Sequence, residues 1–155
     1  MTQIVFTAMT ADEADAFRLD KLDAYGQKPE RSIVSGTLPC RACLGQIRDG
    51  EAALLLAYRP FPSPQPYAET GPIFIHAESC GAYAAREILP PMLDSTDYIV
   101  RGYSSDNRIV YGTGAVTLTN KIAERASELL TRDDIAYVHV RSARNNCYQC
   151  RIERA

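Results

Sequence analysis

The chain has 155 residues, of which 46% are hydrophobic and 23% charged, and these values indicate one globular domain, residues 1–155, with enough apolar material for a core. The 17 basic and 19 acidic residues give a net charge of −2, and the lack of a basic excess or basic stripe argues against nucleic-acid binding. The longest apolar run is too short for a membrane span, and the N-terminus lacks signal-peptide features. The five cysteines are an odd number, which argues against a secreted disulfide framework. We therefore expect a cytoplasmic protein with reduced thiols and no membrane partner.

The first half of the chain predicts short strands around one helix. Thr10-Ala11-Asp12-Glu13 is a capping box, which marks a helix start and puts Phe17 on the apolar face of that helix. Asp49-Gly50 is a strong hairpin signal, because both residues tolerate the positive φ of a two-residue turn. The alternating prolines of residues 59–66 forbid a helix and favour an extended loop. Apolar runs between turn residues predict strands at residues 4–8, 33–35 and 52–58.

The second half predicts two further helices among several strands. The apolar spacing of residues 120–131 indicates the clearest helix, and residues 79–88 form a shorter candidate that Pro90-Pro91 would end. Asn145-Asn146 predicts a tight turn, since asparagine tolerates positive φ. Strands are expected at residues 72–76, 98–103, 108–116, 135–142 and 147–153. The whole pattern predicts an α+β fold, in which about three helices pack against a mostly antiparallel sheet.

Four of the five cysteines form two Cys-x-x-Cys pairs, Cys40 with Cys43 and Cys147 with Cys150. This spacing lets two thiolates meet on one ion where the backbone turns between them. Leu44-Gly45 after the first pair resembles a zinc knuckle, in which a glycine lets backbone amides approach the sulfurs. If the two pairs meet in space, they form a closed four-cysteine zinc site, and structural zinc is the one cofactor that the sequence suggests.

Other interpretations of the cysteines stay open. Cysteines are often small buried hydrophobic residues, and residues three apart on a regular strand, as we expect for Cys147 and Cys150, point to opposite faces. About a hundred residues separate the two pairs, whereas strong zinc signatures are usually compact. A redox pair needs a cysteine at a helix N-terminus, a placement that neither pair has. Cys80, four residues after His76, fits either a Cys–His nucleophile or an inert buried thiol.

A polar sheet face is the second candidate site. Tyr137, His139 and Arg141 alternate with apolar residues, so one face of their strand belongs to the core and the other carries three hydrogen-bonding side chains. If the neighbouring strands add their own polar residues, guanidinium groups would grip a carboxylate or phosphate and histidines would move protons. The alternative is a solvated face with ordinary cross-strand pairs. The candidate ligand-binding residues are Tyr67, Glu69, His76, Arg101, Tyr103, His139 and Arg141.

Three stretches of the chain carry a family resemblance: Leu38–Leu44, Pro66–Ala77 and Tyr137–Tyr148. They resemble the bacterial domain-of-unknown-function family 1203, and the resemblance covers nearly the whole chain from about Gly36 onward. That family has no assigned activity. The resemblance therefore implies a single compact domain of a bacterial protein and no particular chemistry.

Three functions remain as alternatives. The leading hypothesis is a small ligand-binding or regulatory domain that recognises an anionic small molecule through the Tyr/His/Arg face. The second is an enzyme that uses His, Arg and Cys side chains in the same pocket. The third is a structural or interaction protein stiffened by a four-cysteine zinc site. The sequence does not decide whether the protein is an enzyme, and it leaves the oligomeric state and the strand order open.

Overall fold

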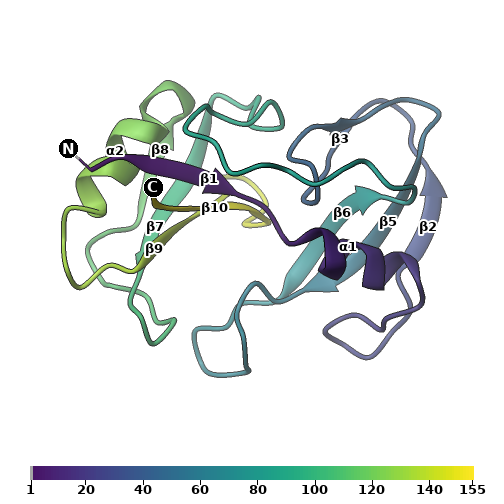
Figure 1. Cartoon of the computed structure of the whole chain (residues 1–155), viewed down its shortest axis with the longest axis horizontal. Helices are drawn as coiled ribbons and strands as arrows, with labels where there is room; N and C mark the ends of the chain where they lie inside the picture. Colours follow the sequence, from purple (N-terminus) through teal and green to yellow (C-terminus); the bar gives the residue numbers. More distant parts are fainter. Residues whose placement is uncertain (1) are drawn as a thin grey trace.

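The largest sheet has five antiparallel strands and forms one side of the computed structural model, which describes residues 2–155 (Figure 1). Its strand order is β1-β10-β9-β7-β8. These strands are β1 (Ile4–Thr7), β10 (Tyr148–Arg154), β9 (Tyr137–Ser142), β7 (Asp97–Tyr103) and β8 (Ala115–Leu118). Strand β1 pairs with β10, so segments from the two ends of the chain meet in this sheet.

A three-stranded antiparallel sheet with the order β2-β5-β6 forms the other side of the molecule (Figure 1). Its strands are β2 (Glu30–Ile33), β5 (Ala52–Tyr58) and β6 (Gly71–His76), and a two-stranded ladder is made by β3 (Leu38–Pro39) and β4 (Gln46–Ile47). Residues 77–96 then run back to the five-stranded sheet with nothing more regular than an isolated bridge. We call residues 77–96 the crossing segment.

Each of the two larger sheets has its own helix and its own hydrophobic core. Helix α1 (Ala11–Arg18) begins at Thr10, whose Oγ1 accepts a hydrogen bond from the Glu13 backbone N–H at 3.1 Å, as the capping box predicts. Its residue Phe17 is buried in the core of the three-stranded sheet. Helix α2 (Ile122–Leu129) follows the 3-10 turn η1 (Thr119–Lys121) and packs against the apolar face of the five-stranded sheet. Within residues 2–155, no helix has the length and apolar character to cross a bilayer.

The mostly antiparallel α+β fold is confirmed, but the described residues contain two α-helices rather than about three. The helix predicted at residues 79–88 is wrong. Gly81 has a φ of +79°, which a right-handed helix excludes. Arg86 instead forms an isolated bridge with Phe6, whose backbone N–H donates to the Arg86 carbonyl at 2.6 Å. Arg86 therefore directs its backbone hydrogen-bonding groups to a distant strand, a partner that local spacing does not reveal.

The predicted turns have different outcomes. Asn145-Asn146 joins β9 to β10 as predicted, with a φ of +60° at Asn146. Asp49-Gly50 also turns the chain, with a φ of +86° at Gly50, yet the hairpin prediction is wrong because β4 and β5 belong to different ladders. Strand β5 pairs with β2 and β6 instead, which buries most of its side chains. The strand predicted at residues 108–116 is largely irregular, with one isolated bridge at Ile109 and a turn at residues 111–112, and β8 begins only at Ala115.

Candidate functional site

The loop between β3 and β4 forms a tight turn that holds Cys40 and Cys43 together. The Cys40 carbonyl accepts a hydrogen bond from the Leu44 N–H, and the Cys40 N–H donates to the Gly45 carbonyl, both at 2.9 Å. Leu44 takes a positive φ of 55°, and its fully buried side chain helps to hold this uncommon conformation. The result is the backbone turn between two thiols that the sequence predicts for a zinc knuckle.

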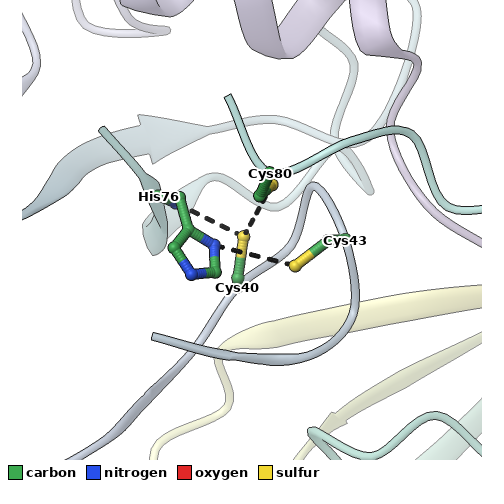
Figure 2. Close-up of side chains that lie close together, drawn as sticks. All are labelled: Cys40, Cys43, His76 and Cys80. Carbon is green, nitrogen blue, oxygen red and sulfur yellow. Dashed lines mark hydrogen bonds between the residues drawn. The ribbon is translucent and has the colours of Figure 1, made fainter. Parts of the chain in front are cut away.

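Four side chains converge beside this turn (Figure 2). The ligand atoms of Cys40, Cys43, His76 and Cys80, which we call the Cys/His cluster, all lie within 4.8 Å of one another, so they could hold a metal ion. His76 is the last residue of β6, and Cys80 lies in the crossing segment. The Cys40 and Cys80 sulfurs are 3.9 Å apart, and the Cys43 sulfur lies 3.7 Å from His76 Nδ1. A tetrahedral zinc site with Zn–S bonds of about 2.3 Å has S···S separations of about 3.8 Å, so the four side chains fit such a site.

The groups around the four ligands suit a metal site as well. The His76 backbone N–H donates to the Cys40 sulfur at 3.3 Å, and Arg18 donates from Nη2 to the Cys80 sulfur at 3.4 Å. The other ring nitrogen of His76, Nε2, lies 3.6 Å from a carboxylate oxygen of Glu51. Histidines that bind metal through one nitrogen usually present the other to a carboxylate or carbonyl. Arg18 adds positive charge beside three potential thiolates, and Glu51 faces the ring nitrogen of His76 that does not point to the sulfurs.

The three thiols of the cluster shift one another's pKa values through hydrogen bonds. The pKa of Cys40 lies far below its usual range because the thiols of Cys43 and Cys80 hydrogen-bond to its sulfur. The pKa values of Cys43 and Cys80 are raised, each chiefly by the hydrogen bond with Cys40. The cluster thus stabilises one thiolate, and a cation would favour ionisation of the other two.

The four-cysteine site predicted from the sequence does not form, because the second Cys-x-x-Cys pair lies elsewhere. Cys150 is fully buried in the core between the five-stranded sheet and α2, and burial raises its pKa to about 12. Cys147 lies in the turn before β10, where its sulfur approaches the Asn145 carbonyl at 3.7 Å. Within residues 2–155, neither cysteine belongs to a group of metal ligands. His76 and Cys80 take the two places instead, and their His-x-x-x-Cys spacing was the signal that could have found them.

The predicted polar sheet face does form on the five-stranded sheet. Register places Arg101 of β7, His139 of β9 and Arg151 of β10 directly opposite one another in a row across three strands. Tyr103 and Tyr137 are paired two residues further along, and their rings are stacked with centroids 5.3 Å apart. Residues opposite each other in a sheet point to the same side, so these side chains share one face.

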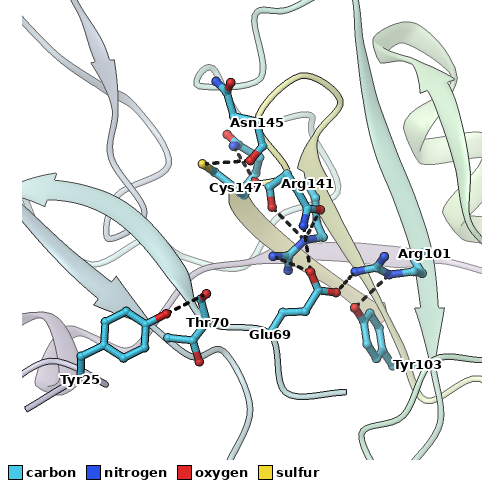
Figure 3. A network of polar contacts seen from close by, with 10 residues as sticks. Tyr25, Glu69, Thr70, Arg101, Tyr103, Arg141, Asn145 and Cys147 are labelled. Atoms are coloured by element: carbon cyan, nitrogen blue, oxygen red, sulfur yellow. Dashed lines mark hydrogen bonds and ion pairs between the residues drawn. The ribbon is translucent and has the colours of Figure 1, made fainter. Parts of the chain in front are cut away.

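A carboxylate from the other side of the molecule neutralises part of this face (Figure 3). Glu69, in the loop before β6, forms ion pairs with both Arg101 and Arg141. It also accepts a hydrogen bond from the Asn146 side chain at 2.9 Å, while Arg101 donates from Nε to the Tyr103 hydroxyl at 3.0 Å. Glu69 is one of the candidate ligand-binding residues that the sequence predicts, and here its carboxylate bridges the two arginines that are expected to bind a ligand.

His139 lies fully buried in the middle of the face. Its ring is surrounded by Phe61, Tyr103, Tyr137 and Tyr148, with centroids 4.8 to 5.2 Å away. Burial lowers the pKa of His139 well below its usual value, and the charges of the neighbouring arginines lower it further. The imidazole is therefore neutral at pH 7, so it offers one donor and one acceptor.

Two of the predicted ligand-binding residues lie away from this face. His76 belongs to the three-stranded sheet and to the Cys/His cluster, since β6 does not pair with β7 or β9. Tyr67 lies on the surface, where its hydroxyl is 2.8 Å from the hydroxyl of Tyr111 and its ring lies under the Arg108 guanidinium. The shared-face argument fails for His76 because alternation fixes the side of a strand and not the sheet to which it belongs.

The fold and these residues define an α+β protein whose most distinctive feature is a group of three cysteines and one histidine that could hold a metal ion. The family model described as "Protein of unknown function (DUF1203)" matches residues 37–154, and the chain therefore belongs to this family. No curated protein and no solved structure matches the chain.

Proposed function

We propose that this protein is a zinc-binding domain in which Cys40, Cys43, His76 and Cys80 hold one structural Zn²⁺. The observation that carries the proposal is the convergence of three sulfurs and one imidazole nitrogen, all within 4.8 Å, from three separate segments of the chain. Thiolate and imidazole donors in a tetrahedral arrangement are characteristic of zinc.

The number of ligands favours a structural role. Four protein ligands close the coordination sphere, whereas catalytic zinc sites keep a position for water or substrate. Zinc binding would also occupy Cys80 and His76, and this argues against the alternative in which these two residues act as a free nucleophile and base. Three thiolates and Zn²⁺ carry a net charge of −1, which the nearby Arg18 guanidinium offsets.

The position of the site explains what the metal would stabilise. It joins the β3–β4 turn, the end of β6 and the beginning of the crossing segment. Residues 77–89 have few buried side chains, and their regular structure is limited to the Arg86 bridge. Zinc would anchor this segment through Cys80 where packing contributes little, and its binding free energy would add to folding stability.

The test is the metal content of protein purified without chelators, together with three single variants. We expect about one zinc per chain in the wild type and in Cys147→Ser, and a large loss of zinc in Cys43→Ser and Cys80→Ser. Cys147→Ser is the matched control, since Cys147 is a half-buried thiol outside the cluster. A wild type without stoichiometric zinc, or a Cys147→Ser variant that loses as much metal as Cys80→Ser, would refute the proposal.

A further inference from the structure

A cavity of about 310 Å³ lies where α1 and the end of β5 face the five-stranded sheet. Aromatic rings form much of its wall: Tyr58 of β5, Phe61 of the following loop and Tyr148 of β10. The Tyr58 and Tyr148 rings are 5.8 Å apart, and both Phe61 and Tyr148 contact the His139 ring. Concave sites with aromatic walls and a few polar groups are typical of small-molecule sites, and flat rings suit a flat ligand body.

Polar atoms without partners lie at the same place. His139 lines the cavity and is fully buried, yet neither of its ring nitrogens has a hydrogen-bond partner among the described residues. Arg151, which also lines the cavity, has a buried Nε without a partner. Buried polar groups in native proteins are nearly always hydrogen-bonded, so two such side chains beside one cavity point to a ligand that satisfies them.

The charges around the cavity favour an anion. Arg59 and Arg151 line it, against the single carboxylate of Glu13. Glu13 lies 3.4 Å from the Tyr58 hydroxyl, which can donate to it, and Glu153 pairs with Arg151 through Nη2 and leaves Nε of that guanidinium free. On the same sheet face, Arg101 and Arg141 add positive potential that Glu69 offsets in part. A guanidinium with a free N–H is well suited to a carboxylate or phosphate oxygen.

We propose that this cavity binds a small molecule that combines an oxyanion with a flat, unsaturated body. The oxyanion accepts hydrogen bonds from Arg151 and Arg59, and the flat body lies against Tyr58, Phe61 and Tyr148. The neutral imidazole of His139 bonds to a polar group of the ligand. This site is separate from the Cys/His cluster and does not depend on zinc.

The chain offers a direct spectroscopic test, because it contains only two histidines. In protein labelled with ¹⁵N-histidine, His139 reports on the cavity and His76 on the cluster. The probes are benzoate, which has both a ring and an oxyanion, inorganic phosphate, which has the oxyanion alone, and benzyl alcohol, which has the ring without the charge. We expect benzoate to shift the His139 ring resonances in a saturable manner, to leave those of His76 in place, and to bind more tightly than either of the other probes.

Variants separate a built site from weak surface binding. Arg151→Gln and Arg59→Gln should each weaken benzoate binding by about tenfold, because each removes a charge-assisted hydrogen bond. Arg31→Gln should leave it unchanged, since Arg31 pairs with Glu78 on the exposed surface. Two variants guard against the failure of one to fold, and the ¹⁵N spectrum itself reports folding.

Three results would overturn the proposal. One is the absence of a His139 shift with benzoate and phosphate at millimolar concentrations, which would leave ordered water as the partner of the buried nitrogens. The second is binding that persists unchanged in folded Arg151→Gln and Arg59→Gln proteins. The third is benzyl alcohol binding as tightly as benzoate, which would remove the oxyanion from the argument. None of these results affects zinc content, so this proposal and the zinc proposal fail independently.

Discussion

Replacing Glu69 by Gln would measure the contribution of a carboxylate that forms ion pairs with two arginines, Arg101 and Arg141. The variant keeps the size of the side chain and one oxygen acceptor, but it removes the negative charge that faces Arg101 and Arg141. The Arg141 side chain is only 4% exposed, so it cannot replace the lost partner with bulk water. One of its guanidinium nitrogens, Nη1, already lacks a hydrogen-bond partner among the described residues.

The expected cost follows from the burial of the three groups. Hydrogen bonds to charged groups contribute about 1.5–3 kcal/mol each, and breaking a fully buried pair by removing one partner costs about 3–5 kcal/mol. Glu69 is 29% exposed and therefore partly screened by solvent, which places this pair below the buried limit. We expect Glu69→Gln to lower the free energy of unfolding by about 2–4 kcal/mol.

The assay is urea unfolding at fixed zinc concentration, with Glu78→Gln as the matched control. Glu78 is 82% exposed and pairs with Arg31, which is 57% exposed, so its loss should cost less than about 1 kcal/mol. With a denaturant slope of about 2 kcal/mol per molar urea, Glu69→Gln should shift the midpoint by about 1–2 M. Equal shifts for the two variants would refute the reasoning, because burial would then not decide the strength of these ion pairs.

Two further predictions concern the thiols and the buried histidine. In the zinc-bound protein, iodoacetamide should modify Cys147 first; a chelator should then expose the half-buried Cys43 and Cys80, while Cys150, buried and with a pKa of about 12, should react last. Mass spectrometry of timed samples checks this order, and rapid labelling of Cys80 before chelation would contradict it. The lowered pKa of His139 means that below the unfolded-state value of about 6.5 the unfolded chain binds a proton that the folded protein does not. The stability is thus fully present above about pH 6.5 and falls with decreasing pH, by up to about 1.4 kcal/mol per pH unit, until the folded pKa is reached. Denaturation curves from pH 7.5 to 5 should show a smaller loss of unfolding free energy in His139→Gln than in the wild type. Acid release of zinc affects both proteins, so the difference between them isolates the contribution of His139. An equal loss in the two proteins would show that His139 is not buried in the neutral form.

Features that depend on neighbouring residues could be predicted well from the sequence. The Thr10 cap and the turn at Asn146 rest on interactions within a few residues, the strand at residues 52–58 is marked by its own apolar run, and the structure contains all three. The polar face around His139 also follows from local alternation, since a strand with one buried apolar face must present its other residues on the opposite side.

Features that depend on distant partners could not be predicted in the same way. Local spacing predicts a helix at residues 79–88, but Arg86 pairs with Phe6 instead. Asp49-Gly50 predicts a hairpin between β4 and β5, but β5 pairs with β2 and β6. The metal site shows the same limit. The sequence predicts that the two Cys-x-x-Cys pairs form one site. The fold instead buries Cys150 in the core between the five-stranded sheet and α2, and it places Cys80 beside Cys40.

The pairing of β1 with β10 has a consequence for how the chain folds as it is made. Among the ten strands in residues 2–155, β1 is synthesised first, and its partner β10 is synthesised last. Until then, the hydrogen-bonding groups and apolar residues of β1 have no native neighbour in the five-stranded sheet, and a contact so distant in sequence is slow to form. The three-stranded sheet and the Cys/His cluster lie wholly within residues 30–80, so this half can form earlier and the five-stranded sheet only afterwards. During synthesis the chain would thus carry β1 without its partner strand until β10 is made. An unpaired strand of this kind can be bound by a chaperone or can pair wrongly with a strand of another chain.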